Sequence, residues 1–161
     1  LAKEFPNTGD LVKTVMNYQV FFNREVIKNQ HLSFAKIKQT VVDFLKEDPC
    51  VLYACDMEKT MTESIPEEVK YRIVNGYNRE RSGDVQIVLK PNFYTHGMKG
   101  TDHGAWNLYD THIPLVFMGW GIKHGATTKR TFMTDIVPTI GALIHVQAPN
   151  GCVGQPISFT R

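Results

Sequence analysis

Three stretches rich in aromatic and β-branched residues predict strands in the first ninety residues. They are residues 18–22 (Tyr-Gln-Val-Phe-Phe), 51–54 (Val-Leu-Tyr-Ala) and 85–89 (Val-Gln-Ile-Val-Leu). Residue types of this kind favour the pleated, half-buried surface of a sheet. The last of the three follows a turn, Arg81-Ser82-Gly83-Asp84, which marks its beginning.

Apolar residues recur at helical spacing between and after these strands. The first predicted helix covers residues 34–46, with Ser33 as a suitable N-cap and Pro49 after its end. A second begins in Ser64-Ile65-Pro66-Glu67, a capping-box pattern with an early proline, and ends near Gly76. Thr134-Asp135 opens a third, whose apolar stripe consists of Ile136, Ile140, Leu143 and Ile144.

A fourth strand is predicted over residues 113–118, where Ile-Pro-Leu-Val-Phe-Met is apolar throughout. Such a run is typical of a strand buried on both faces of a sheet in an α/β protein. We therefore expect this strand to be central, with Leu115 and Phe117 less than about 10% exposed. Taken together, the elements predict an α/β fold with α+β character, in which helices flank a mixed sheet.

Composition supports one folded domain spanning residues 1–161. The 161 residues are 42% hydrophobic and 21% charged, which excludes disordered and coiled-coil classes. The net charge of +2 argues against an electrostatically driven nucleic-acid surface, and no apolar run reaches the length of a membrane span. Cys50, Cys55 and Cys152 are too few for a complete disulfide framework. No secretory signal is present within these residues.

Candidate chemistry concentrates in one segment, since five of the six histidines lie from His96 onward. Asp102 and His103 stand between Gly100 and Gly104, and Asp110 and His112 follow shortly after. A neutral imidazole can bind a metal, which makes His103 a candidate ligand. The alternative is a hydrogen-bonded loop histidine. Two-metal hydrolytic sites need about six protein ligands, and carboxylates are scarce here, so the chain looks short of catalytic groups.

Several runs resemble the C-terminal part of single-subunit, phosphate-irrepressible bacterial alkaline phosphatases. These enzymes belong to the alkaline phosphatase superfamily, beside the nucleotide pyrophosphatase/phosphodiesterases. The resemblance is carried by residues 81–91 (Arg-Ser-Gly-Asp-Val-Gln-Ile-Val-Leu-Lys-Pro), 100–104 (Gly-Thr-Asp-His-Gly) and 109–115 (Tyr-Asp-Thr-His-Ile-Pro-Leu). Residues 134–139 (Thr-Asp-Ile-Val-Pro-Thr) are similar to a helix start that recurs across the superfamily, sulfatases included.

The resemblance implies a hydrolase that cleaves phosphate esters with two zinc ions. A threonine or serine nucleophile would form a covalent phospho-enzyme that activated water then cleaves. The nucleophile and most zinc ligands would lie in an N-terminal catalytic part outside this chain, so no catalytic residue is assigned within it. His103 alone matches the last histidine ligand. Asp102 stands where the family more often has threonine, and Asp102, Asp110 and His112 are candidates to support the ligand through hydrogen bonds.

The chain is thus expected to be a C-terminal domain or fragment of a larger phosphatase. By itself it would be inactive and would not hold zinc. Its expected partners are a phosphate ester substrate of the parent and the missing N-terminal part, with neither nucleic acid nor membrane. The resemblance implies a periplasmic or secreted location. Two alternatives remain: a non-catalytic binding module that keeps the fold, and a relative of phosphodiesterase or sulfatase type.

Overall fold

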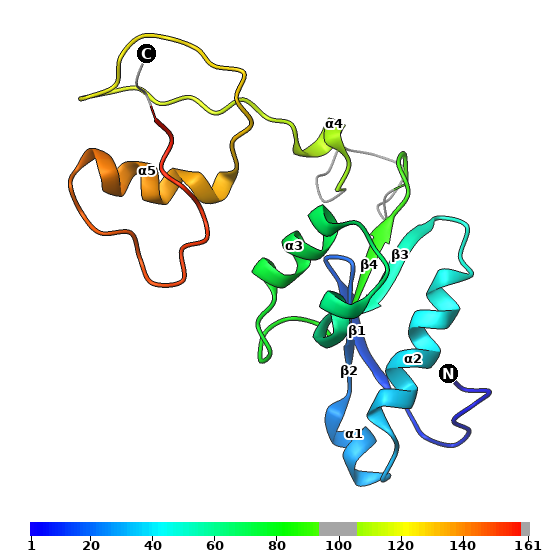
Figure 1. The fold of residues 1–161 in the computed structure, drawn as a ribbon. Coiled ribbons are helices and arrows are strands. Elements are labelled where there is room, and N and C mark those ends of the chain that lie inside the picture. Colours follow the sequence, from blue (N-terminus) through cyan, green and yellow to red (C-terminus); the bar gives the residue numbers. More distant parts are fainter. Residues whose placement is uncertain (94–105, 159–161) are drawn as a thin grey trace. The chain divides into compact units, whose positions relative to one another are not determined.

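The computed structural model describes residues 1–93 and 106–158, and it divides into two compact units. The first comprises Leu1–Ile113 and the second Pro114–Arg161. Figure 1 shows a sheet with helices in the first unit and one principal helix in the second. Each unit is described by itself below. That the whole chain forms one domain stays a prediction.

The first unit is built on a four-stranded sheet in which every pair of neighbouring strands is antiparallel. The strand order is β1-β2-β4-β3. The two central strands, β2 and β4, are therefore adjacent in the sheet although they are not consecutive in the chain. Residues 17 and 18, an asparagine and a tyrosine, join the first two strands with positive φ angles of 51° and 58°. The strands are β1 (Val12–Met16), β2 (Gln19–Phe22), β3 (Val51–Asp56) and β4 (Val85–Leu89).

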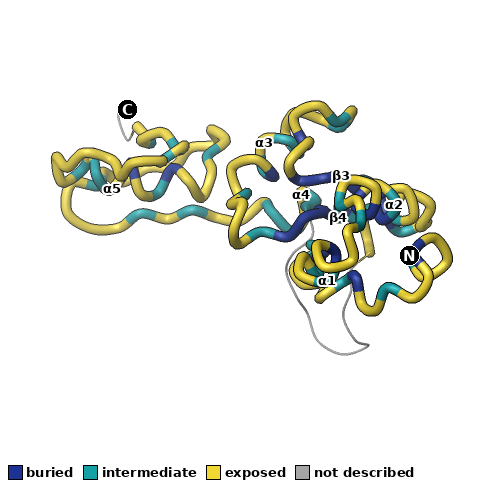
Figure 2. Tube along the Cα trace, turned by 90° about the horizontal axis from the view of Figure 1, so that it is seen from below, coloured by how far each residue is buried: buried dark blue, intermediate teal, exposed yellow. Residues whose placement is uncertain are grey.

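Both faces of this sheet are covered, because successive residues of a strand point to opposite sides. Ala54 of β3 belongs to the larger core, which α1 (Arg24–Asn29) and α2 (Phe34–Lys46) help to close. Cys55, the next residue, belongs to a smaller core on the other side with Met57 of η1 (Met57–Thr62) and Ile73 of α3 (Glu67–Gly76). In Figure 2 the buried residues gather along β3, β4 and α2. Helices flanking a sheet confirm the predicted fold class, but the described sheet is antiparallel throughout rather than mixed.

The predicted helices of the first unit are confirmed, but one predicted cap is wrong. Helix α2 has the predicted bounds, and the Ser33 hydroxyl accepts a hydrogen bond from the backbone N–H of Lys36 at 3.3 Å. Helix α3 ends at Gly76 as expected. Its N-cap is Pro66, with no side-chain cap, rather than Ser64. Pro66 brings a fixed φ to that position, so the helix begins without the serine.

The turn before β4 depends on the absence of a side chain at Gly83. A Cβ atom there would lie 2.7 Å from Gln19 Cβ and 2.9 Å from the backbone oxygen of Val20. The Gly83 N–H donates to Gln19 Oε1 at 2.8 Å, and Gln19 Nε2 donates to Gln86 Oε1 at 3.1 Å. Gly83 and Gln86 of the Arg-Ser-Gly-Asp-Val-Gln run are therefore explained by the close approach of β2 and β4.

We expect Gly83→Ala to lower the free energy of unfolding by about 1–3 kcal/mol, because the added methyl group overpacks this contact. Urea unfolding followed by circular dichroism measures the change. Gly76→Ala is the matched control, since nothing lies within 4 Å of its Cβ position. That variant should be unchanged or up to about 1 kcal/mol more stable. Equal stability of the two variants would show that Gly83 is not constrained by packing.

The second unit is held by polar contacts of the Asp-x-x-Pro-Thr segment. Its elements are η2 (Met133–Asp135) and α5 (Ile136–Leu143). The Asp135 carboxylate accepts from the backbone N–H groups of Phe132 and Gln155, each at 2.9 Å. The Thr139 hydroxyl donates to the Asp135 carbonyl and accepts from the Ile157 N–H at 2.9 Å. These two side chains fasten the segment around residue 156 to the beginning of α5, and we call this set of contacts the polar clamp.

The predicted strand over residues 113–118 is wrong, because these residues belong to no sheet of the described structure. Leu115 and Phe117 are half-buried, whereas the exposed fractions of Val116 and Met118 are 81% and 94%. Of the apolar stripe predicted on the last helix, Ile140 and Ile144 are exposed, whereas Ile136 and Leu143 are half-buried. The apolar pattern predicts burial, but among the described residues no sheet or helix covers these side chains.

No helix in the described part of the chain has the length and apolar character needed to cross a membrane.

Candidate functional site

The candidate metal-binding segment follows the end of β4, and its two ends are joined by one side chain. The hydroxyl oxygen of Tyr109 accepts a hydrogen bond from the backbone N–H of Asn92 at 2.9 Å and another from Asn107 Nδ2 at 3.1 Å. Asn107 is also the N-cap of α4 (Leu108–Thr111). The described residues on either side of residues 94–105 are therefore fixed to each other at the carboxyl end of β4.

The predicted metal ligand His103 and its neighbour Asp102 lie outside the described residues. Asp110 is half-buried in α4 and makes an interaction, so it is not a free carboxylate. His112 is exposed as the C-cap of α4, and its backbone N–H donates to the Leu108 carbonyl. The supporting roles of Asp102, Asp110 and His112 therefore stay predictions.

Two residues beside this segment have structural partners. Lys90 Nζ donates to the Pro49 carbonyl at 2.7 Å, which holds the end of β4 to the turn before β3. Trp106 packs against the smaller core around Cys55 and Ile73. Neither contact is with a group that could act in catalysis. Among the residues that the structure describes, no group of three or more histidine, cysteine or acidic side chains is placed to hold a metal ion.

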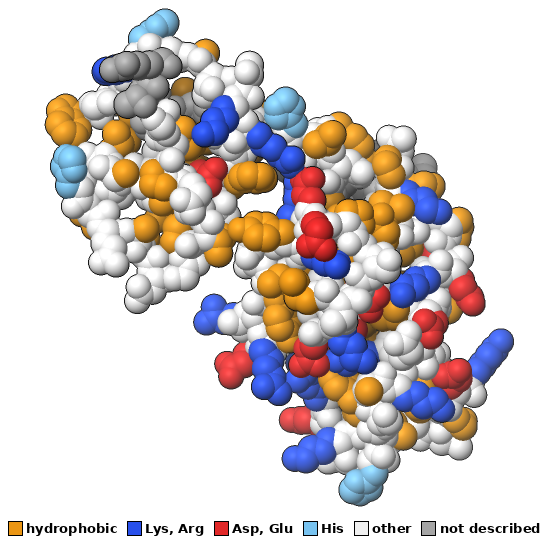
Figure 3. Space-filling model, in the orientation of Figure 1, with side chains coloured by type: hydrophobic (Ala, Val, Ile, Leu, Met, Phe, Trp, Pro, Cys, Tyr) orange, Lys and Arg blue, Asp and Glu red, His pale blue; other side chains and the backbone are white. Residues whose placement is uncertain are grey.

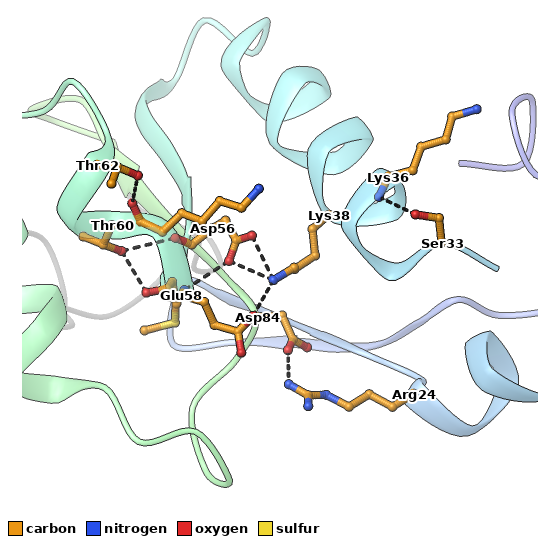
Figure 4. Close-up of polar contacts among 11 residues, drawn as sticks. Arg24, Ser33, Lys36, Lys38, Asp56, Glu58, Thr60, Thr62 and Asp84 are labelled. Carbon is orange, nitrogen blue, oxygen red and sulfur yellow. Dashed lines mark hydrogen bonds and ion pairs between the residues drawn. The ribbon is translucent and has the colours of Figure 1, made fainter. Parts of the chain in front are cut away.

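A buried charged cluster at the other end of β4 was missed by sequence analysis. Lys38 of α2 is 5% exposed, and its ammonium group lies 2.8 Å from Asp56 Oδ2 and 2.8 Å from Glu58 Oε2. Figure 4 shows Lys38 pointing from α2 toward these two carboxylates. Asp56 ends β3 and also accepts from the Glu58 N–H, which starts η1. The signal was present in the sequence, because Lys38 occupies a position within the apolar stripe of α2.

A second ion pair lies nearby, where Asp84 immediately precedes β4. The buried Asp84 carboxylate accepts from the backbone N–H of Phe22 at 3.2 Å and from the guanidinium of Arg24. The Arg24 guanidinium and the Lys38 ammonium each lie over the ring of Phe34, at 5.2 and 5.0 Å from its centroid. An open hollow of about 480 Å³ beside this pair is lined by Lys13, Phe21, Phe22, Arg24, Arg79, Glu80, Ser82 and Asp84.

The electrostatics of the cluster favour its charged state. Burial lowers the pKa of Lys38, but the hydrogen bonds and charges of Asp56 and Glu58 outweigh burial, and the net pKa is raised. The hydrogen bond and the charge of Lys38 hold the pKa of Glu58 below its ordinary value. Among the described residues no buried side-chain polar atom is left without a hydrogen bond. The cluster is thus a satisfied structural network.

Cys50 and Cys55 are not activated as nucleophiles. Burial raises the pKa of Cys55 to about 11, so its thiol is protonated at neutral pH. Burial and the charge of Asp48 also raise the pKa of Cys50. The described residues therefore supply scaffolding around the candidate segment, and the chemistry expected of His103 needs further groups.

Comparison with known proteins shows which proteins this chain is similar to. The chain is 45% identical over 150 residues to the alkaline phosphatase PafA of Elizabethkingia meningoseptica and 47% identical over 145 residues to the alkaline phosphatase PhoV of Synechococcus elongatus. A protein of Myroides odoratus named calcium-transporting ATPase is 43% identical over 159 residues. No protein-family profile matches the chain.

The fold agrees with the sequence. A crystal structure of PafA matches 98% of this chain with a TM-score of 0.89 and 43% identity. The chain is therefore similar, over nearly its whole length, to a part of these alkaline phosphatases, which confirms the resemblance seen in the sequence. Its particular similarity is to PafA and PhoV, of whose lengths it spans 28% and 26%.

Proposed function

We propose that this chain is the C-terminal part of an alkaline phosphatase-type hydrolase that cleaves phosphate esters. The observation that carries the proposal is the joint agreement of sequence and fold with PafA over nearly the whole chain. Function does not follow from fold alone, but 43–47% identity to two alkaline phosphatases favours the same class of chemistry. The periplasm or the cell exterior is the location that we propose for the parent protein.

In this proposal the chain contributes one metal ligand and the surroundings that hold it. His103 would be a ligand of one of two zinc ions, which when bound supply a Lewis acid and an activated water. The described residues do not by themselves form a metal site, so no step of the reaction is assigned to them. Their role is to fix both ends of the segment that carries His103, through Tyr109 and its two donors.

The nucleophile, a threonine or serine, is proposed to lie in the part of the relatives that this chain does not match. It would attack the phosphorus atom and expel the alcohol, and water would then release phosphate from the phospho-enzyme. Because a catalytic zinc needs about three protein ligands, His103 alone would not hold it. We therefore expect the isolated chain to be inactive.

The test compares the isolated chain with a chimera in which this chain replaces the matching part of PafA. With zinc present, we expect the chimera to hydrolyse an aryl phosphate and the isolated chain to show no turnover above background. A phosphate diester, a sulfate ester and ATP extend the assay to the alternative classes. Robust zinc-dependent turnover by the isolated chain, or a preference of the chimera for the sulfate ester, would contradict the proposal.

A further inference from the structure

The second unit has a defined conformation without an apolar core of its own. Within its described part, Pro114 to Ser158, only Asp135, Pro138 and Thr139 are buried. The polar clamp fixes the chain around α5, and Gly154 approaches so closely that a Cβ atom would lie 1.9 Å from the Thr134 carbonyl oxygen. These contacts give the unit a defined backbone conformation, although it buries almost no apolar side chain.

Its apolar side chains instead form organised exposed surfaces. Val137, Ile140 and Ile144 are exposed on α5 and just beyond it, at positions i, i+3 and i+7 of one helical face. Along residues 115–118 exposure alternates, with Leu115 and Phe117 half-buried and Val116 and Met118 exposed. Trp120 is 82% exposed. Figure 3 shows hydrophobic side chains at the surface of this unit. We call Val116, Met118, Trp120, Val137, Ile140 and Ile144 the apolar surface.

Charge is nearly absent from this part of the chain. Between Pro114 and Ser158 the charged residues are Lys123, Lys129, Arg130 and Asp135, and the last is buried within the polar clamp. Surfaces designed to stay in water are given about 25–35% charged residues. Depletion of charge and enrichment in large apolar side chains are instead typical of the core of an interface.

The comparisons indicate what covers the apolar surface. The conformation of this chain matches PafA over 98% of its residues, yet it corresponds to only 31% of that chain. The same conformation, without a core of its own, therefore occurs within a polypeptide about three times as long. We propose that the apolar surface docks against the larger part of an alkaline phosphatase-type chain. This is the part of such a chain that lies outside the 31% matched here, and the proposal rests on the proposed function. Docking would bury Val116 and Met118, which lie on the same side of an extended segment.

The test places the same substitutions in two contexts. Val116→Lys and Ile140→Lys are made in the isolated chain and in the PafA chimera described above, and thermal unfolding is measured for each. In the isolated chain both residues are exposed, so we expect no change in the unfolding midpoint. In the chimera each lysine would be buried against apolar partners, so the midpoint should fall by several degrees. Phe44→Lys and Met61→Lys are the controls, because these exposed residues belong to the first unit, and both should be tolerated in both contexts.

Hydrogen exchange measured by mass spectrometry gives a readout that does not depend on unfolding midpoints. Amides of residues 115–118 should exchange at least about 100-fold more slowly in the chimera than in the isolated chain. Tolerance of both lysine variants in the chimera, with equal exchange in the two contexts, would overturn the proposal. So would a concentration-dependent dimer of the isolated chain that Val116→Lys dissolves while the chimera is unaffected, since the occupant would then be a second copy. Neither readout requires phosphatase activity, so failure of the proposed function is seen separately.

Discussion

Replacing Lys38 by methionine is expected to lower the free energy of unfolding of the first unit by about 3–5 kcal/mol. Methionine fills a similar volume but leaves the buried carboxylate of Asp56 without its counter-ion. Removing one partner of a buried ion pair costs more than the pair itself contributes, because an uncompensated charge remains in a poorly solvated place. Chemical unfolding monitored by far-ultraviolet circular dichroism measures the loss.

Two further variants separate this mechanism from general damage to α2. Lys36→Met makes the same substitution two residues earlier, where the side chain is exposed and its ammonium group lies 5.6 Å from the centroid of the Phe5 ring. It should cost no more than about 1 kcal/mol. Asp56→Asn combined with Lys38→Met removes both charges while an amide oxygen still caps η1, so it should recover much of the loss. Similar losses in all three variants would contradict the buried-pair explanation.

The pH dependence of stability supplies an independent check on the same cluster. The pKa of Glu58 is lowered, so its contribution is present above its ordinary pKa and is lost as the pH falls through the lowered value. The pKa of Lys38 is raised, so its contribution is complete below its ordinary pKa and is lost only as the pH rises through the raised value. In Lys38→Met the acid-side loss due to Glu58 should be smaller. Because Glu58 is partly exposed, this effect is modest.

In the chimera with PafA, we expect His103→Ala to reduce kcat/KM for an aryl phosphate by more than about 100-fold. Removal of a metal ligand deprives one of the two proposed sites of an imidazole, so zinc content should also fall. Metal analysis of the purified protein and steady-state kinetics measure the two effects together. The unfolding midpoint of the metal-free protein should not change.

The matched control for this variant is His124→Ala, which alters an exposed histidine of the second unit. It should retain both zinc and activity. If His103→Ala kept its full complement of zinc and its activity, the segment would not contribute a ligand, and the resemblance at residues 100–104 would be structural only.

Local signals were sufficient to predict α2 and β4. Ser33 starts α2 and Pro49 follows it, while β4 begins after a glycine turn, so short-range chemistry determines these elements. The first strand, β1, was missed because the turn of Asn17 and Tyr18 adopts positive φ without glycine, and Tyr18 was assigned to a strand. The resulting sheet could not be completed from sequence pattern alone.

The predicted strand at residues 113–118 and the missed charged cluster have a common cause. Both depend on contacts between segments that are distant in sequence. Neither the apolar run at residues 113–118 nor the lysine at position 38 indicates which distant segment it contacts. Val116 is apolar but exposed, and Lys38 is charged but buried. The candidate ligand His103 lies within residues 94–105, outside the described residues. Its assignment therefore depends on family resemblance and not on observed geometry. Tyr109, which joins the two sides of that segment, gave no recognisable signal, because a tyrosine hydroxyl that accepts two hydrogen bonds has no sequence pattern.

The position of the buried ion pair also selects one alignment of β3 against β4. Asp56 is paired with Val85 at the end of the ladder and meets Lys38 there. A shift of β3 by one residue would turn every side chain to the opposite face, which would bring Cys55 to the lysine and move the carboxylate away. The ammonium group would then be enclosed without a counter-charge, so we expect misaligned pairings of β3 and β4 to be unfavourable even though both strands are almost entirely apolar. We therefore expect the cluster to favour the native strand pairing over competing ones during folding.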